Sequence, residues 1–179
     1  YSTAMFLIAV ALLMFFAGGV PLVHFGRLFG VVVPISAILL FTKEHRVQRL
    51  IGFLRPEYDP TGTGYQILAA RRALRSGGLW GVGIGGSSSK LGLLPEAHAD
   101  FLFAVVGEEL GFIGVVAIFG LFAYLAYRGI RAAIRSTDRF RSLLLFGLTC
   151  SILLQALLNL AVVVGAVPAT GIPLPFFSS

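Results

Sequence analysis

Apolar residues occur along this chain in four long stretches with little charge, and the charged residues are concentrated in the segments between them. An α-helix needs about 20 predominantly apolar residues to cross the hydrocarbon core of a bilayer. Such stretches predict membrane-spanning helices, because a helix satisfies its own backbone hydrogen bonds in lipid. The predicted spans are residues 4–20, 25–42, 101–127 and 142–167.

The second span is the shortest of the four if only its charge-free part is counted. As a helix, Leu28–Thr42 would rise about 22 Å, against a hydrocarbon core of about 30 Å. The span is therefore expected to begin near Phe25, with the side chain of Arg27 reaching toward the lipid headgroups. Pro34 lies inside it, which a membrane helix tolerates.

The segment 43–99 is predicted to be a long loop that contains two short helices. From Glu44 to Leu54 and from Tyr65 to Arg75, apolar residues recur at helical spacing with arginines opposite them. This pattern is typical of amphipathic helices that lie in the plane of a membrane surface. The predicted fold class is all-α, a polytopic transmembrane helix bundle that forms a single membrane domain over residues 1–179.

Composition supports a membrane protein. The chain is 57% hydrophobic and 12% charged, with a mean hydropathy of +0.91, whereas about a quarter of the residues of a typical soluble domain are charged. The net charge is +6. In an integral membrane protein, basic residues set topology and contact anionic lipid, so nucleic acid is not an expected partner. Cys150, the single cysteine, lies in an apolar run and is expected to pack as a small hydrophobic residue.

The charge distribution predicts an orientation. Residues 128–141, RGIRAAIRSTDRFR, carry five Arg and one Asp, which places this connector in the cytoplasm by the positive-inside rule. Counting spans from it puts the loop 43–99 and the tail 168–179 on the outer face. The chain opens on Tyr1 and an apolar run without a basic leader, so we expect it to be a piece of a longer membrane protein.

A glycine-rich run, Gly81-Val-Gly83-Ile-Gly85-Gly86, satisfies the pattern GxGxxG. A dinucleotide site would need a strand before this run and a helix that opens on it. An arginine-rich amphipathic segment precedes it instead, and serines follow. We therefore interpret the run as a flexible or closely packed outer loop, whose backbone N–H groups could still approach a phosphate.

A polar cluster, Glu96, His98 and Asp100, comes directly before the third span. Asp100 suits the N-cap of that helix. It would equally suit a general base that acts on a membrane-bound substrate at the outer boundary. The two roles are compatible, because a capping residue is rigidly held. Lys90, Glu96 and His98 are candidate substrate-binding residues. Lys90 and the loop arginines are mostly expected to form a solvated face, although some of them could bind pyrophosphate.

Polar residues inside the spans are candidates for support of the site. Glu108 and Glu109 would lie about 12 Å along the third span. Acids inside a membrane are functional candidates by default, and hydrogen bonding between helices is an equally good interpretation. Gln155 and Asn159, one turn apart in the fourth span, are expected to form interhelical hydrogen bonds.

Four sequence runs together resemble the SEDS family of shape, elongation, division and sporulation proteins. The run LPEAHADFLFAVVGEELGFIG at residues 94–114 is the most specific of them, and the resemblance covers essentially the whole chain. Departures are Ser89 before Lys90, where the family usually has Gln, and Ala99 in place of a common Thr. The other three runs are GYQ at 64–66, SGGLWGVGIGGSSSK at 76–90 and TGIPLPFFSS at 170–179.

The resemblance implies an activity and a site. Full members have ten spans, of which this chain would supply the sixth to the ninth. They are peptidoglycan glycosyltransferases of the bacterial inner membrane that polymerise lipid II and work with a class B penicillin-binding protein and other divisome or elongasome proteins. The family motif places the catalytic aspartate at Asp100, on the periplasmic face, and implies a divalent cation (Mg or Mn) with unknown ligands. The form of the motif is closer to the division and sporulation branch, and we favour division.

Two other functions fit the same residues. A lipid II flippase would also use polar residues within spans, and a non-catalytic scaffold would only recruit the penicillin-binding protein. Asp100 separates them, because a polymerase needs this carboxylate and a scaffold does not. The isolated 179-residue piece is expected to be inactive under any of these functions, because four spans cannot enclose the cavity.

Overall fold

The computed structural model describes residues 2–58, 63–83, 85–86, 102–172 and 174–176. All regular elements among these residues are helices, which confirms the all-α class. The helices, in chain order, are α1 (Ser2–Ala17), α2 (Leu22–Phe41), α3 (Glu44–Leu54), the 3-10 helix η1 (Pro56–Tyr58), α4 (Thr63–Gly77), α5 (Leu102–Arg135) and α6 (Arg139–Val163).

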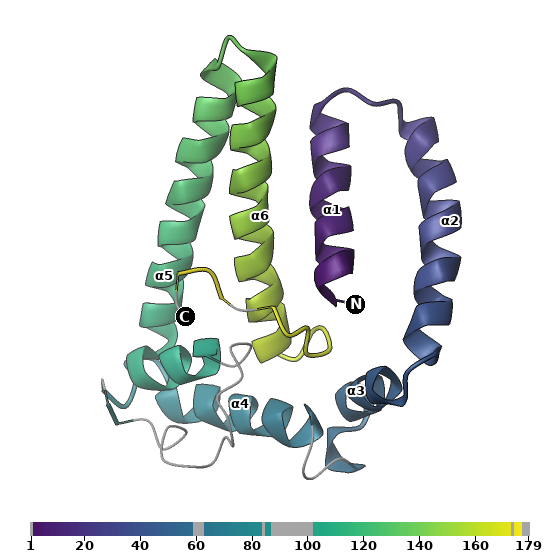
Figure 1. Ribbon diagram of the computed structural model, residues 1–179. Coiled ribbons are helices and arrows are strands. Elements are labelled where there is room, and N and C mark those ends of the chain that lie inside the picture. The colour runs from purple at the N-terminus through teal and green to yellow at the C-terminus, as the bar shows by residue number, and fades with distance from the viewer. Residues whose placement is uncertain (1, 59–62, 84, 87–101, 173, 177–179) are drawn as a thin grey trace.

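The long helices stand side by side, and the two amphipathic helices lie across one end of them (Figure 1). α5 packs against α6 and α4, while α1 packs against α6. α2 stands on the far side of α1 and leads into α3. We call the end that carries α3, α4 and the N-terminus the lower end. The α1–α2 turn and the α5–α6 connection both lie at the upper end. The loop and the connector therefore lie at opposite ends, as the predicted topology requires.

Three of the helices are long and apolar enough to cross a membrane, and α1, with 16 residues, is shorter. The span predicted over residues 25–42 is α2, which begins earlier, at Leu22, and reaches 20 residues with Pro34 inside it. That length rises about 30 Å, the thickness of the hydrocarbon core. The charge-free run Leu28–Thr42, which is too short to span by itself, is thus extended on its N-terminal side.

The arginine-rich connector is largely helical, and the helices that contain the third and fourth predicted spans extend into it. α5 continues to Arg135 and α6 begins at Arg139. The side chain of Asp138 caps α6 by accepting a hydrogen bond from the backbone N–H of Phe140, at 3.3 Å. Ser136–Asp138 alone separates the two helices, since a capping residue lets a new helix start within one turn.

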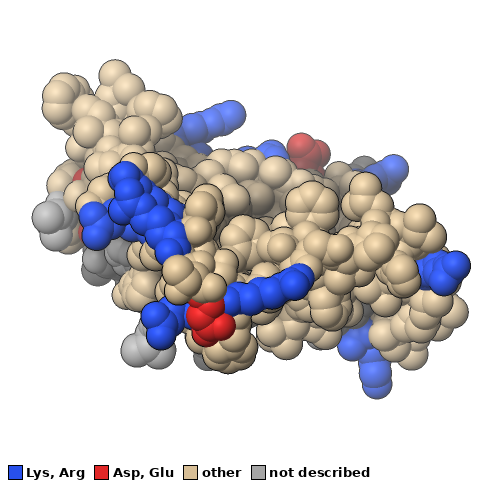
Figure 2. Space-filling view, turned by 90° about the horizontal axis from the view of Figure 1, so that it is seen from above, with Lys and Arg blue, Asp and Glu red and all other residues tan. Residues whose placement is uncertain are grey.

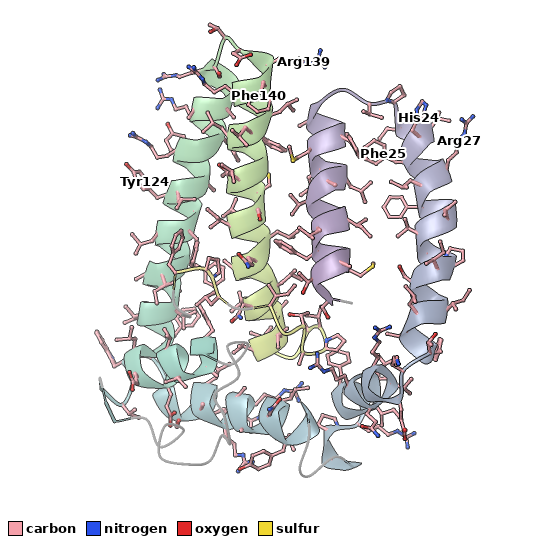
Figure 3. All side chains as sticks on the ribbon, viewed as in Figure 1. His24, Phe25, Arg27, Tyr124, Arg139 and Phe140 are labelled. Carbon is pink, nitrogen blue, oxygen red and sulfur yellow. The ribbon has the colours of Figure 1, made fainter. Side chains whose placement is uncertain are left out.

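Basic side chains mark the upper end. Viewed from above, Lys and Arg side chains stand out on a largely uncharged surface with little red (Figure 2). Arg139 reaches across from the start of α6 and donates to the carbonyl of Gly18, at 2.7 Å. On α2, Phe25 packs edge-on against Phe16 of α1, with ring centroids 6.4 Å apart (Figure 3). The Arg139 hydrogen bond joins the α1–α2 turn to α6, and the ring contact joins α1 to α2 beside that turn.

The buried core lies at the lower end, where α4 crosses α5 and α6. Ile67, Ala70 and Ala73 occupy one face of α4 and are buried, whereas Arg71 and Arg72 on the other side are exposed. This arrangement confirms the amphipathic pattern predicted for the segment. The face packs into a cluster with residues of α5, α6 and the tail, namely Phe103, Ala104, Phe122, Ala156, Val162, Val163 and Leu174.

Candidate functional site

The four residues predicted to bind substrate or act in catalysis, Lys90, Glu96, His98 and Asp100, lie outside the described residues. The structure does describe what surrounds them in sequence. The segment 87–101 is bounded on one side by the glycine-rich run that follows α4 and on the other by Leu102, where α5 begins. The described residues nearest to the site in sequence are therefore the glycine-rich run and the start of α5, at the lower end of the bundle. We call these two segments the frame of the site.

The most distinctive feature of this frame is a break in α5 at Gly111. Its backbone angles are φ 66° and ψ −168°, far from the helical values near −63° and −42°. This region of backbone space is essentially restricted to glycine. Before the break, α5 lies across the lower end near α4, and after it α5 runs upward beside α6 (Figure 1). The helix that contains the third predicted span is therefore bent at Gly111.

Residues 78–83, which we call the glycine strap, form backbone hydrogen bonds with the residues on both sides of the break. These bonds replace the helical bonds that are lost there. In an unbroken helix, the N–H groups of residues 112 and 113 would donate to the carbonyls of residues 108 and 109. Here Phe112 N donates to Gly78 O at 2.9 Å, and Ile113 N donates to Leu79 O at 3.3 Å.

The carbonyls left over at the break are satisfied by the same strap. Val82 N donates to Glu108 O at 3.0 Å, and Gly83 N donates to Glu109 O at 3.1 Å. A buried backbone group without a partner costs about 1–3 kcal/mol. The strap therefore removes a penalty at two donors and two acceptors, which makes the break tolerable at a membrane boundary.

Glycine is required where the strap meets the break because the two backbones touch. A Cβ at Gly81 would overlap the carbonyl of Glu109, and a Cβ at Gly111 would lie 2.6 Å from Leu79 O. At the end of α4, a Cβ at Gly77 would overlap the carbonyl of Gly107. Within the glycine-rich run, Gly81 is thus packed closely against the break in α5.

Glu108 and Glu109 lie at the break, just before Gly111, and are 2% and 9% exposed. The Oγ atom of Ser76 lies 3.3 Å from Glu108 Oε1, and the backbone N–H of Gly85 donates to Glu109 Oε1 at 3.2 Å. Glu108 therefore faces the end of α4, and Glu109 faces the residues just after the strap. The sequence placed them some 12 Å up a straight span, and the bend is what removes them from that axis.

Asn159 ties α6 to the C-terminal tail. Its side chain is 1% exposed, and Nδ2 donates to the carbonyl of Ile172 at 3.3 Å. This bond holds the tail against the lower end of α6, and the predicted interhelical bonds of Asn159 and Gln155 stay a prediction. Gln155, one turn earlier, is half-buried. Arg71 of α4 also reaches this region, because a Cβ at Gly165 would lie 2.7 Å from its Nη2 atom.

A cleft of about 680 Å³ opens at the lower end between α1, α2, α3, α6 and the tail. Its walls are mostly apolar, but Arg46 and Arg49 of α3 line it. Arg46 also donates to the carbonyl of Leu39 at the end of α2, at 2.5 Å. Thr170 contributes a buried Oγ1 that has no hydrogen-bond partner among the described residues. Cationic groups beside an apolar hollow suit a ligand with an anionic head and a hydrocarbon chain.

The predicted divalent cation has no ligand set in the described part of the chain, where no three His, Cys, Asp or Glu side chains lie together. The two buried carboxylates, Glu108 and Glu109, contact a hydroxyl and a backbone N–H instead. Glu96, His98 and Asp100 have the right donor chemistry for such an ion, but they fall outside the described residues.

The hydropathy of the helices and the frame at the lower end define an integral membrane protein of the polytopic helical class. The family model of the FtsW, RodA and SpoVE cell cycle proteins matches residues 1–179, so the chain belongs to that family. This confirms the SEDS resemblance and indicates the bacterial inner membrane.

Named relatives agree with the family model. The "Probable peptidoglycan glycosyltransferase FtsW" of Borreliella burgdorferi is 46% identical over 182 residues, which cover 100% of this chain and 49% of the relative. "Stage V sporulation protein E" of Bacillus subtilis is 38% identical over 179 residues, which cover 99% of this chain and 48% of the relative. The chain thus spans about half the length of these curated relatives.

A solved structure shares the fold. Its subject is the structural coordination of polymerization and crosslinking by a peptidoglycan synthase complex. One of its chains superimposes with a TM-score of 0.75 at 29% identity, over 99% of this chain and 49% of the other. The arrangement of α1 to α6 is therefore an arrangement that a chain of a peptidoglycan synthase adopts.

Sequence reasoning missed the role of the strap and the break. The sequence feature that could have indicated it is a repeated glycine spacing. Gly77 and Gly81 are four residues apart, as are Gly107 and Gly111. Nothing in the sequence alone shows that these two runs touch.

Proposed function

We propose that the whole protein is a peptidoglycan glycosyltransferase that polymerises lipid II into glycan strands, for septal or elongation cell-wall synthesis. The observation that carries this proposal is the family match over all 179 residues, which includes the run LPEAHADFLFAVVGEELG that leads into α5. Relatives at 46% and 45% identity bear the name of that activity. We favour the division branch, since these relatives are named FtsW.

In the proposed reaction, Asp100 acts as general base. Its carboxylate removes the proton from the 4-hydroxyl of the acceptor GlcNAc, whose oxygen attacks the anomeric carbon of the donor sugar. A new glycosidic bond forms as the bond from that carbon to undecaprenyl pyrophosphate breaks, and the pyrophosphate leaves with the electron pair. A positioned base of this kind contributes about 10²–10⁴-fold to a rate.

The leaving pyrophosphate needs positive charge, because negative charge develops there in the transition state. Lys90 is the sequence candidate for this role, together with Glu96 and His98 for substrate binding. A divalent cation, when bound, would supply further charge stabilisation at the pyrophosphate. The apolar cleft lined by Arg46 and Arg49 supports a lipid-linked substrate, since it offers hydrocarbon contact beside cationic groups.

We also propose that the lower end faces the periplasm, where lipid II is consumed. The arginines at the upper end support this orientation through the positive-inside rule. The partner proposed is a class B penicillin-binding protein, with other divisome or elongasome proteins around it. Support comes from the structural neighbour, which belongs to a synthase complex that couples polymerization with crosslinking.

The test is Asp100→Asn in the full-length protein reconstituted with its penicillin-binding partner. This change keeps the size of the side chain and removes the base, so polymer formed from lipid II should fall at least about 10²-fold. Asp138→Asn is the matched control, because it removes a carboxylate at the opposite end while asparagine still caps α6. That control should polymerise like the wild type.

Full polymer yield from Asp100→Asn would overturn the proposed chemistry. Lipid II that crosses vesicle membranes without forming polymer would instead indicate a flippase. Unchanged crosslinking by the partner, with no polymer formed by the wild-type protein itself, would indicate a scaffold.

A further inference from the structure

The glycine strap and the two glutamates of the GEELG run form one structure that the proposed reaction does not use directly. Four backbone hydrogen bonds join residues 78–83 to residues 108–113 across the break in α5. Two further contacts, from Ser76 to Glu108 and from Gly85 to Glu109, join the carboxylates to residues just before and just after the strap. The break is therefore held on both sides rather than left as a hinge.

The segment that the break orients is residues 102–110. Phe103 and Ala104, near its start, are both fully buried against α4 and α6, and the ring of Phe103 packs edge-on against Phe119, with centroids 5.5 Å apart. The segment is thus anchored at one end by the core and at the other by the strap. In the sequence, Asp100 precedes Leu102, where this segment begins, by two residues.

We propose that the strap is a positioning device for the reaction, with Gly81 and Gly111 as its positioning residues. The backbone exchange fixes the angle between residues 102–110 and the rest of α5, and the start of that segment, Leu102, follows Asp100 by two residues in the sequence. Glu108 and Glu109 lock the strap in place and do not act on substrate. This inference rests on the proposed function of Asp100.

Two glycines of the strap allow a matched comparison. Gly81 and Gly83 both have positive φ, 79° and 95°, so alanine at either position meets similar conformational strain. Only at Gly81 would the added Cβ overlap the backbone of Glu109, whereas Gly83 has open space within 4 Å. Gly81→Ala therefore separates the strap from the break, and Gly83→Ala controls for strain.

The experiment compares both variants with the wild type in the full-length protein bound to its partner. Hydrogen–deuterium exchange over residues 78–86 and 108–116 reports whether the strap is closed. Polymerisation kinetics on lipid II give kcat and KM. We expect Gly81→Ala to lose protection in both regions and to lose about 10- to 100-fold in kcat, because a misplacement near 1 Å costs about that much. KM should stay within about twofold, and Gly83→Ala should keep both protection and kcat.

A Gly81→Ala protein with an open strap and wild-type kcat would overturn the inference, as would equal effects of the two variants. A wild-type protein that forms no polymer would instead contradict the proposed function. If Gly81→Ala does not fold, Ser76→Ala tests the same point more mildly by removing the hydroxyl that lies 3.3 Å from Glu108 Oε1 and 2.9 Å from the carbonyl of Ala73. Its kcat should fall while KM holds, and Ser76→Thr should restore it. An unchanged kcat in Ser76→Ala would then count against the strap.

Discussion

Gly129 of α5 lies close against Thr149 of α6, and this contact makes a quantitative prediction. A Cβ at Gly129 would overlap the hydroxyl of Thr149 and lie 2.8 Å from its methyl group. Thr149 is 6% exposed, and its hydroxyl already donates to the carbonyl of Leu145 at 2.7 Å. The side chain therefore has little freedom to move away, so Gly129→Ala must push the helices apart.

The magnitude follows from comparison with Gly120 on the same helix. A Cβ there would meet nothing within 4 Å, so Gly120→Ala should gain the helix propensity of alanine, about 0.8–1 kcal/mol. Gly129→Ala gains the same propensity and loses about 1–3 kcal/mol to overpacking. Since propensity cancels between the two, Gly129→Ala should be less stable than Gly120→Ala by about 1–3 kcal/mol.

The assay is unfolding of the full-length protein in detergent micelles by titration with sodium dodecyl sulfate, followed by circular dichroism. A double-mutant cycle with Thr149→Ala identifies the cause, because this change removes the two atoms that clash most. We expect a favourable coupling of about 1 kcal/mol or more between the two substitutions. Equal stability of Gly120→Ala and Gly129→Ala, or additive effects in the cycle, would refute close packing of α5 on α6 at this point.

Two further predictions concern the lower end. Phe103→Ala should destabilise the protein by about 3–5 kcal/mol, because Phe103 is fully buried, whereas Phe112→Ala, at a position 60% exposed, should cost far less; the same titration measures both. Asn159→Ala should release the tail, since it removes the hydrogen bond to Ile172. Hydrogen–deuterium exchange should then rise over residues 168–174, and an unchanged pattern there would mean that the tail is held by other contacts.

The sequence by itself determined the class of fold and the local elements. α3 begins at Glu44 and ends at Leu54, the limits that amphipathic spacing predicts, and α4 extends the predicted segment by two residues at each end. These elements are readable because periodicity and uncharged length are local properties of the chain. The family resemblance was readable for the same reason, as its motifs are contiguous runs.

Tertiary structure alone decided where the carboxylates at the third span lie. Glu108 and Glu109 could have been functional acids or structural partners, and the sequence left both open. The bend at Gly111 and the strap that satisfies it removed them from the membrane axis. The two segments that exchange hydrogen bonds lie about 30 residues apart along the chain, and a backbone exchange leaves no trace in side-chain periodicity. The only trace of this exchange in the sequence is a glycine at each point where the two backbones touch, because only glycine lets them come so close.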